Sequence, residues 1–170
     1  ERAMASDSVE LVGLHAHIGS QVFEVEAFSR AVEVLVEFAG PFGLPELSVG
    51  GGLGVPYVEG ETAPTITEWA AGIRAVCGAA GVTAGISAEP GRAIVAAAAV
   101  TLYRVGTVKE LPGLRTYVAV DGGMSDNPRP VLYGSGYETF LPRAADAERP
   151  RPVRVVGKHC ESGEIGRAHV

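Results

Sequence analysis

Apolar and polar positions at the start of the chain alternate with a period of two. VELVGLHAHI (9–18) is short, is rich in β-branched and aliphatic residues and stops at the turn residues GSQ, which predicts a strand. A period of two places Gly13, His15 and His17 on one face of that strand.

The period then changes to that of a helix. EAFSRAVEVLVEFAG (26–40) has apolar residues at helical spacing and stops at glycine with a proline behind it, and PELSVGGGLGVPY (45–57) predicts a strand that runs into glycines. TITEWAAGIRAVCGAAG (65–81) begins with Thr65 and Glu68 at capping-box spacing, which predicts a second helix. The expected buried stripes are Phe28, Ala31, Leu35 and Phe38 on the first helix, and Ile66, Trp69, Ile73, Val76, Cys77 and Ala80 on the second.

A third strand, ending near Glu89, and a third helix, starting around Gly91, follow in TAGISAEPGRAIVAAAAV (83–100). Repeated strand–helix units are typical of a parallel sheet or barrel. From residue 101 the pattern changes to extended segments separated by Pro and Gly, with no helix expected, so we place a domain boundary near residue 100. The polar, proline-rich segment 142–152 predicts a surface loop.

Composition limits the class of function. The chain has 170 residues, 46% of them hydrophobic and 20% charged, which is typical of a globular protein. It has no apolar run of membrane-spanning length and no leader pattern at its start, so we expect a cytoplasmic protein. A net charge of -6 without a basic block argues against nucleic acid or a membrane as partner and favours a small molecule. Cys77 and Cys160 are too few for a disulfide framework and are expected to be thiols, with Cys77 buried as a small hydrophobe on a helix face.

Each predicted strand ends in residues suited to binding. Sites in parallel α/β architectures gather at the carboxyl ends of strands. Glycines in VGGGLG let a backbone come close to a ligand and can cradle a phosphate, although a tight turn explains them equally well. In AEPGR, Gly91 and Arg92 at a helix start favour an anion, whereas Glu89 suits a cationic ring nitrogen. A Glu89–Arg92 ion pair is the alternative.

Five motifs in this order resemble one family: GLHAHIGSQ, GGGLGVPY, AEPGR, DGGMSDNPRPVLY and GKHCESGE. The chain closely resembles the diaminopimelate decarboxylases, pyridoxal-phosphate enzymes related to alanine racemase and ornithine decarboxylase. The resemblance implies an α/β fold in which residues 1–100 form the last strand–helix units of a pyridoxal-phosphate-binding (β/α)8 barrel and residues 101–164 form part of an all-β domain. Residues 165–170 are expected to be a non-native tail, because EIGRAHV abandons the strand pattern and matches what a sequencing adapter would encode.

The resemblance also implies a role for each motif. His17 would stack on the pyridine ring and Glu89 would pair with its nitrogen. Arg129 and Tyr133 would bind the substrate carboxylate, and Glu161 its distal ammonium. The implied cofactor-binding residues are His17, Ser20, Gly50, Gly51, Gly52, Glu89, Pro90, Gly91 and Arg92, of which Arg92 would lie near the phosphate or a substrate carboxylate.

Cys160 resembles the proton-handling thiol of the family, which reaches the active site of the other subunit in a head-to-tail homodimer and protonates the carbanion. The alternative is a buried cysteine at a strand end. His15 and His159 are expected to be structural or surface residues. A metal site built from these two histidines with His17 and Cys160 lacks zinc-type spacing, so no metal is expected.

The resemblance is incomplete. The lysines, Lys109 and Lys158, both lie in the predicted β-domain, so the Schiff-base lysine of the family is missing and we expect a fragment that is inactive alone. The implied activity of the parent protein is decarboxylation of meso-2,6-diaminopimelate to L-lysine. A sister decarboxylase of arginine, ornithine or carboxynorspermidine, and a non-catalytic homologue that binds a partner protein, remain alternatives.

Overall fold

The computed structural model describes residues 2–161 and 167–169, and it divides into two units. The first unit comprises Glu1–Pro56 and Thr62–Ala99, and the second comprises Tyr57–Glu61 and Val100–Val170. Each unit has its own cluster of buried apolar side chains. Within the described residues, no helix is long and apolar enough to cross a membrane.

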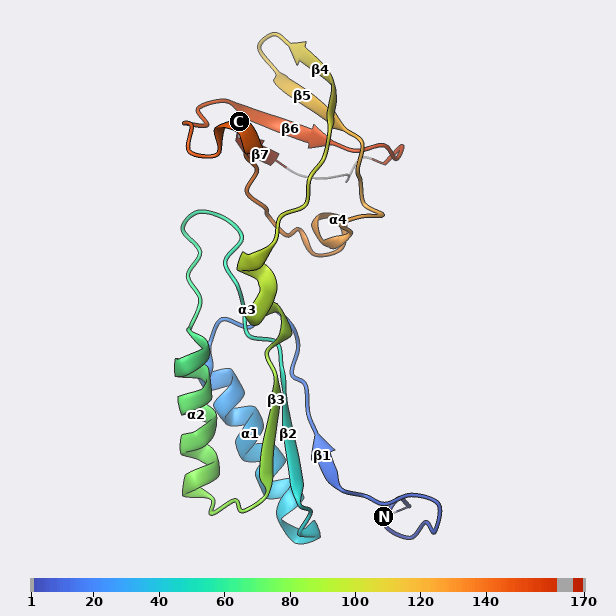
Figure 1. Ribbon diagram of the computed structural model, residues 1–170, viewed down its shortest axis with the longest axis vertical. Helices are drawn as coiled ribbons and strands as arrows, with labels where there is room; N and C mark the ends of the chain where they lie inside the picture. The colour runs from blue at the N-terminus through green and yellow to red at the C-terminus, as the bar shows by residue number, and fades with distance from the viewer. Residues whose placement is uncertain (1, 162–166, 170) are drawn as a thin grey trace. The chain divides into compact units, whose positions relative to one another are not determined.

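The first unit is a three-stranded parallel sheet with two long helices on one face (Figure 1). The strands are β1 (Gly13–His15), β2 (Glu46–Gly51) and β3 (Gly85–Glu89), in that spatial order. Helix α1 (Val25–Ala39) links β1 to β2, and α2 (Ile66–Ala79) links β2 to β3. Two short 3-10 turns, Gly40–Phe42 and Ala96–Ala98, and the five-residue helix α3 (Gly91–Val95) complete the unit. The predicted repeat of strand–helix units is therefore confirmed.

The predicted β1 is longer than the observed strand. Pairing begins where Gly13 lies opposite Glu46, the first residue of β2, so the residues before Gly13 have no strand partner there. One further backbone hydrogen bond lies beyond each end of the paired segment. The Glu46 N–H donates to the Val12 carbonyl, and the Ala16 N–H donates to the Ser48 carbonyl. Tertiary context therefore limits a segment whose composition alone favours a longer strand.

The core of the first unit lies between the sheet and the two helices. Its centre combines Phe28, Val32 and Leu35 of α1 with Leu47 and Val49 of β2 and with Trp69, Ile73 and Cys77 of α2. Phe28 meets the Trp69 ring edge to face, with the ring centroids 5.7 Å apart. The expected α2 stripe is confirmed at Trp69, Ile73 and Cys77, whereas Ile66 is 41% exposed.

The predicted α1 stripe is wrong at one end. Phe38 is 63% exposed, and its ring lies beside that of Phe42, with the ring centroids 5.5 Å apart. Val32 is buried in the core instead. Positions 28, 32 and 35 lie on the face that meets the sheet, and Ala39 continues that face, whereas Phe38 lies to one side of it around the helix.

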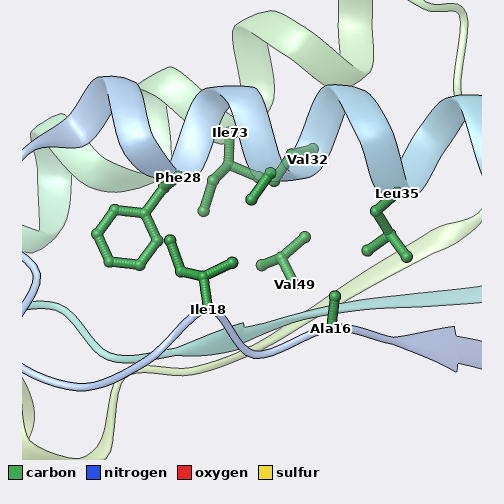
Figure 2. A pocket seen from close by; sticks show the side chains of 8 residues that line it. Ala16, Ile18, Phe28, Val32, Leu35, Val49 and Ile73 are labelled. Carbon is green, nitrogen blue, oxygen red and sulfur yellow. The ribbon is translucent and has the colours of Figure 1, made fainter.

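A small apolar hollow of about 10 Å³ lies between α1 and the sheet. Figure 2 shows Phe28, Val32 and Leu35 pointing down from α1 toward Ala16, Ile18 and Val49. A space of this size holds at most one water molecule, and its lining offers no polar side chain to bind one. The hollow is therefore a packing gap in the core.

The second unit is a four-stranded sheet in the order β4-β5-β6-β7. Its strands are β4 (Val105–Leu111), β5 (Arg115–Val120), β6 (Pro152–Val156) and β7 (Arg167–His169). The β4–β5 and β6–β7 pairs are antiparallel, and β5 and β6 are parallel. Val153 and Val155 are its buried centre, packed against Val118 and Val120.

Two expectations for the second unit are wrong. A helix does occur after residue 101, because Arg129–Tyr133 forms α4, and a 3-10 turn spans Pro142–Ala144. The end of the chain also returns to strand geometry, since β7 pairs with β6. Residues 162–166 and 170, which include half of the suspected tail, lie outside the described residues. A non-native origin of 165–170 therefore stays a prediction.

Candidate active site

The carboxyl ends of β1, β2 and β3 approach one another so closely that only glycine fits between them. A Cβ on Gly50 would lie 3.0 Å from the His17 Cα, and one on Gly51 would lie 2.7 Å from the Glu89 carbonyl carbon. A Cβ on Gly52 would lie 3.0 Å from the Gly19 carbonyl carbon. The glycines thus bring together the segments that carry His17, Ser20 and Glu89.

Two of these glycine N–H groups already have partners. The Gly51 N–H donates to Nδ1 of His17 at 3.2 Å, and the Gly50 N–H donates to the Ser48 hydroxyl at 3.4 Å. Accepting at Nδ1 leaves Nε2 of a neutral His17 ring to carry the proton. In this arrangement the Gly51 N–H orients His17 and the glycines permit close approach, while the predicted phosphate cradle stays a prediction.

The helix-free face of the sheet carries the polar side chains. Leu47 and Val49 of β2 are buried on the side that faces the helices, so Ser48 between them faces the other way. His15 of β1 lies opposite Ser48, and Ser87 of β3 lies opposite Ser48 on its other side. Period two places His17 and Glu89 on the same face, nearer the carboxyl ends of the strands.

Glu89 contacts a histidine that sequence reasoning set aside. Its Oε2 lies 3.3 Å from Nε2 of His15, and the two side chains are 61% and 49% exposed. The His15 and His17 rings are roughly parallel, with their centroids 6.5 Å apart. The period of two in GLHAHIG already placed both histidines on one face. The sequence also shows small residues, Ser48 and the glycines, on β2, and these leave His15 room to reach β3.

Arg92 lies beside Ser20. Its Nη2 donates to the Ser20 Oγ at 3.4 Å, which pairs a cationic and a hydroxyl donor on the segments that follow β3 and β1. Gly91 is the first residue of α3, as expected, and Pro90 precedes it as the cap, but α3 has only five residues and buries none of them. A helix this short adds little dipole, so the positive charge there comes mainly from the Arg92 guanidinium.

Arg129 and Tyr133 come from α4 in the second unit. The Arg129 guanidinium carbon lies 5.1 Å from the centre of the Tyr133 ring. The backbone N–H of Arg129 donates to the Asn127 side-chain oxygen at 3.3 Å. Within the described residues, the Nε of Arg129 is buried and has no hydrogen-bond partner. A buried guanidinium N–H without an acceptor is costly, and a ligand carboxylate would satisfy it.

Cys160 and Glu161 lie in an exposed segment that follows β6. The segment is tied to the loop after β5: the Lys158 N–H donates to the Gly122 carbonyl at 2.9 Å, and the His159 Nε2 lies 2.8 Å from the Ser125 hydroxyl. The alternative of a buried strand-end cysteine is therefore wrong for Cys160.

Cys77 differs from Cys160 in its surroundings. It is 7% exposed in the core of the first unit, and burial raises the pKa of its thiol, so the expectation of a buried apolar thiol is confirmed. The two thiols thus differ in access to solvent, with only Cys160 able to meet a small molecule.

The proposed metal ligands do not form a cluster. Across residues 2–161 and 167–169, no group of three or more His, Cys, Asp and Glu side chains could hold a metal ion. His15 and His17 belong to the first unit, whereas His159 and Cys160 belong to the second.

Residues 1–96 match the family model described as pyridoxal-dependent decarboxylase, pyridoxal binding domain. The diaminopimelate decarboxylase of Synechocystis sp. is 46% identical over 168 residues, which cover 93% of this chain and 36% of that protein. The Mycobacterium tuberculosis (H37Rv) enzyme of the same name is 42% identical over 183 residues, covering 96% of this chain and 41% of that protein.

Among solved structures, the chain is similar to diaminopimelate decarboxylase from Helicobacter pylori complexed with L-lysine, with a TM-score of 0.82 and 32% identity. The match covers 99% of this chain and 42% of that one. These findings confirm the predicted resemblance and the α/β fold class. The chain spans well under half the length of the relatives it matches.

Proposed function

Because the chain belongs to the pyridoxal-dependent decarboxylases, we propose that the protein containing it decarboxylates meso-2,6-diaminopimelate to L-lysine and carbon dioxide. The observation that carries this proposal is the 46% identity to the Synechocystis diaminopimelate decarboxylase over 93% of the chain, which includes both units. The same reading makes it a cytoplasmic biosynthetic enzyme.

Pyridoxal 5'-phosphate is the cofactor that the first unit would hold. Arg92 and Ser20 offer donors for its phosphate, and Pro90 and Gly91 lead into that site from β3. The glycines Gly50, Gly51 and Gly52 leave space where a Cβ would intrude. When bound, the pyridoxal ring supplies the electron sink for the bonding pair that carbon dioxide leaves behind.

His17 and Glu89 would orient the ring. The contact from the Gly51 N–H fixes the His17 imidazole in one orientation, which supports a role as a stacking surface. Glu89 lies on the same sheet face with its carboxylate open to solvent, which supports its pairing with the pyridine nitrogen. An ionised carboxylate at that nitrogen keeps it protonated.

Arg129, Tyr133 and Glu161 would select the substrate. The buried, unpaired Nε of Arg129 supports carboxylate binding, and Tyr133 beneath the guanidinium holds its plane. Glu161 would receive the distal ammonium by charge pairing. A substrate with a second carboxylate needs a cation of its own, which favours diaminopimelate over ornithine.

Cys160 would protonate the substrate carbon after carbon dioxide departs. The exposed thiol and the ordered segment that carries it support this role. We propose that it acts in the site of the second subunit of a homodimer, so that each site needs both copies.

The test compares full-length protein, recovered from its genomic locus, with Cys160→Ala and with Cys77→Ala as the matched control. Wild type and Cys77→Ala should bind pyridoxal phosphate and form lysine from meso-diaminopimelate. Cys160→Ala should keep the absorbance of the bound cofactor and lose at least about a hundredfold in kcat. Equal turnover in Cys160→Ala and wild type would remove the thiol from the mechanism.

A further inference from the structure

His15 reaches across the sheet to the carboxylate proposed for the cofactor ring. Its Nε2 lies 3.3 Å from the Glu89 Oε2. We infer that His15 is a positioning residue, which holds one oxygen of Glu89 so that the other faces the pyridine nitrogen. This inference rests on the proposed function, because it gives Glu89 its role at the cofactor.

The contact depends on the strand between the two residues. His15 lies on β1 and Glu89 on β3, while β2 runs between them. Adjacent strands lie about 4.8 Å apart, so the pair spans about twice that distance. Ser48, opposite His15 on β2, and Gly51, opposite Glu89, are both small residues on the strand between the pair. A bulky residue there would separate the pair.

The pair also explains how Glu89 can be oriented at the end of an exposed strand. Every residue of β3 is exposed, so packing does not fix the Glu89 side chain. A glutamate has three rotatable side-chain bonds, and a free one samples many rotamers. The Nε2–H of His15 offers a donor to one carboxylate oxygen, which selects the rotamers that keep the carboxylate over the helix-free face.

The two histidines of GLHAHIG therefore have different roles on the same face of the sheet. His17 is held through Nδ1 by the Gly51 N–H and would meet the ring face, whereas His15 meets the carboxylate that pairs with the ring nitrogen. Their rings are 17° from parallel, with the centroids 6.5 Å apart.

The experiment uses full-length protein with His15→Gln and His15→Asn. The side-chain nitrogen of Gln reaches as far as Nε2 of His, while that of Asn stops one bond short, and both residues are polar. The apparent Kd for pyridoxal phosphate is measured by absorbance titration of cofactor-free protein, and the position of the bound cofactor's visible band is recorded. Ser87→Ala, on the same sheet face, is the control.

His15→Gln and Ser87→Ala should keep the Kd within about threefold of wild type, and His15→Asn should raise it about tenfold and shift the band. If His15→Asn does not fold, His15→Ser carries the same expectation. A wild-type Kd and a wild-type band in His15→Asn would overturn the inference. Equal losses of cofactor affinity in His15→Asn and His15→Gln would overturn it too. Wild type that binds no pyridoxal phosphate would overturn the proposed function, and the inference with it.

Discussion

Replacing Gly51 with alanine tests whether the close approach of the strand ends builds the site. The new Cβ would lie 2.7 Å from the carbonyl carbon of Glu89 and nearer still to its oxygen, whereas ordinary contact begins at 3.4 Å. Gly51 and Glu89 are paired in the sheet, so β2 and β3 must move apart by at least about 0.7 Å where they carry the site.

The new Cβ, which is fixed to the backbone of residue 51, would clash with backbone atoms of Glu89, so no side chain can rotate away to relieve the clash. Overpacking of this kind costs about 3 kcal/mol, the upper end of the usual range. Displacement of Glu89 also moves it relative to His17, whose ring is held by the Gly51 N–H. We therefore expect Gly51→Ala to lower both the melting temperature and the affinity for pyridoxal phosphate, the latter by more than about tenfold.

The assay is thermal unfolding together with cofactor titration of the full-length protein. Gly78→Ala is the matched control, because Gly78 lies inside α2 and a Cβ there meets nothing within 4 Å. Because Gly78 lies in the last turn of α2, that control should raise stability by less than the gain of about 1 kcal/mol in a helix interior, and it should leave cofactor binding unchanged. A Gly51→Ala protein with wild-type melting and wild-type cofactor affinity would refute the reasoning.

Three further predictions concern substrate binding, a helix cap and the isolated chain. Arg129→Lys keeps the charge but loses the planar fork over Tyr133, so the KM for diaminopimelate should rise about tenfold while kcat changes less; an unchanged KM contradicts carboxylate binding there. Thr65→Ala removes the capping box of α2 and should lower the free energy of unfolding by about 1 kcal/mol at pH 7. In that box, hydrogen bonds from the Thr65 backbone and side chain lower the pKa of Glu68 below its usual 4.5. Because the pKa of Glu68 is lower in the folded state, the stability that its charged form contributes is present above pH 4.5 and is lost as the pH falls through the folded pKa. The difference in unfolding free energy between Thr65→Ala and wild type should therefore become smaller in acid. The isolated 170-residue chain should release no carbon dioxide from diaminopimelate and should aggregate, because its sheet edges and apolar residues such as Phe38 are uncovered; turnover by that chain would contradict this.

Local sequence signals predicted the elements of the first unit well. The capping box from Thr65 to Glu68 is present in full, and α2 begins at the next residue after Thr65. Periodicity identified α1 and α2, because both helices have a continuous apolar face against one sheet. Periodicity did not fix the exact centre of the buried face, so Phe38 was assigned to the core although it lies beside the face that Val32, Leu35 and Ala39 form.

Short elements of the second unit were harder to predict. RPVLY contains a β-branched residue, an aromatic residue and a proline, and it follows Pro128, which favours extended structure by composition. In the structure Pro128 caps the helix and Pro130 occupies its first turn, where a missing N–H costs nothing, and Gly134 ends it with a φ of 65°. Five residues are too few for a period to show.

The candidate site was predicted residue by residue but not contact by contact. The motifs named His17, Glu89 and Arg92, and strand alternation placed His15 and His17 on one face. The bonds that orient them involve partners far along the chain, such as His15 with Glu89 and Ser20 with Arg92. Such pairs depend on sheet order and on small residues between strands, which no local pattern records.

The most direct test of the account is product analysis with the full-length protein. Purified enzyme with pyridoxal phosphate is given meso-diaminopimelate, arginine or ornithine in separate reactions, and carbon dioxide and amines are quantified. We predict equimolar carbon dioxide and L-lysine from meso-diaminopimelate, and little turnover of the other two. Consumption of arginine or ornithine with diaminopimelate untouched, or no carbon dioxide from any of the three, would contradict it.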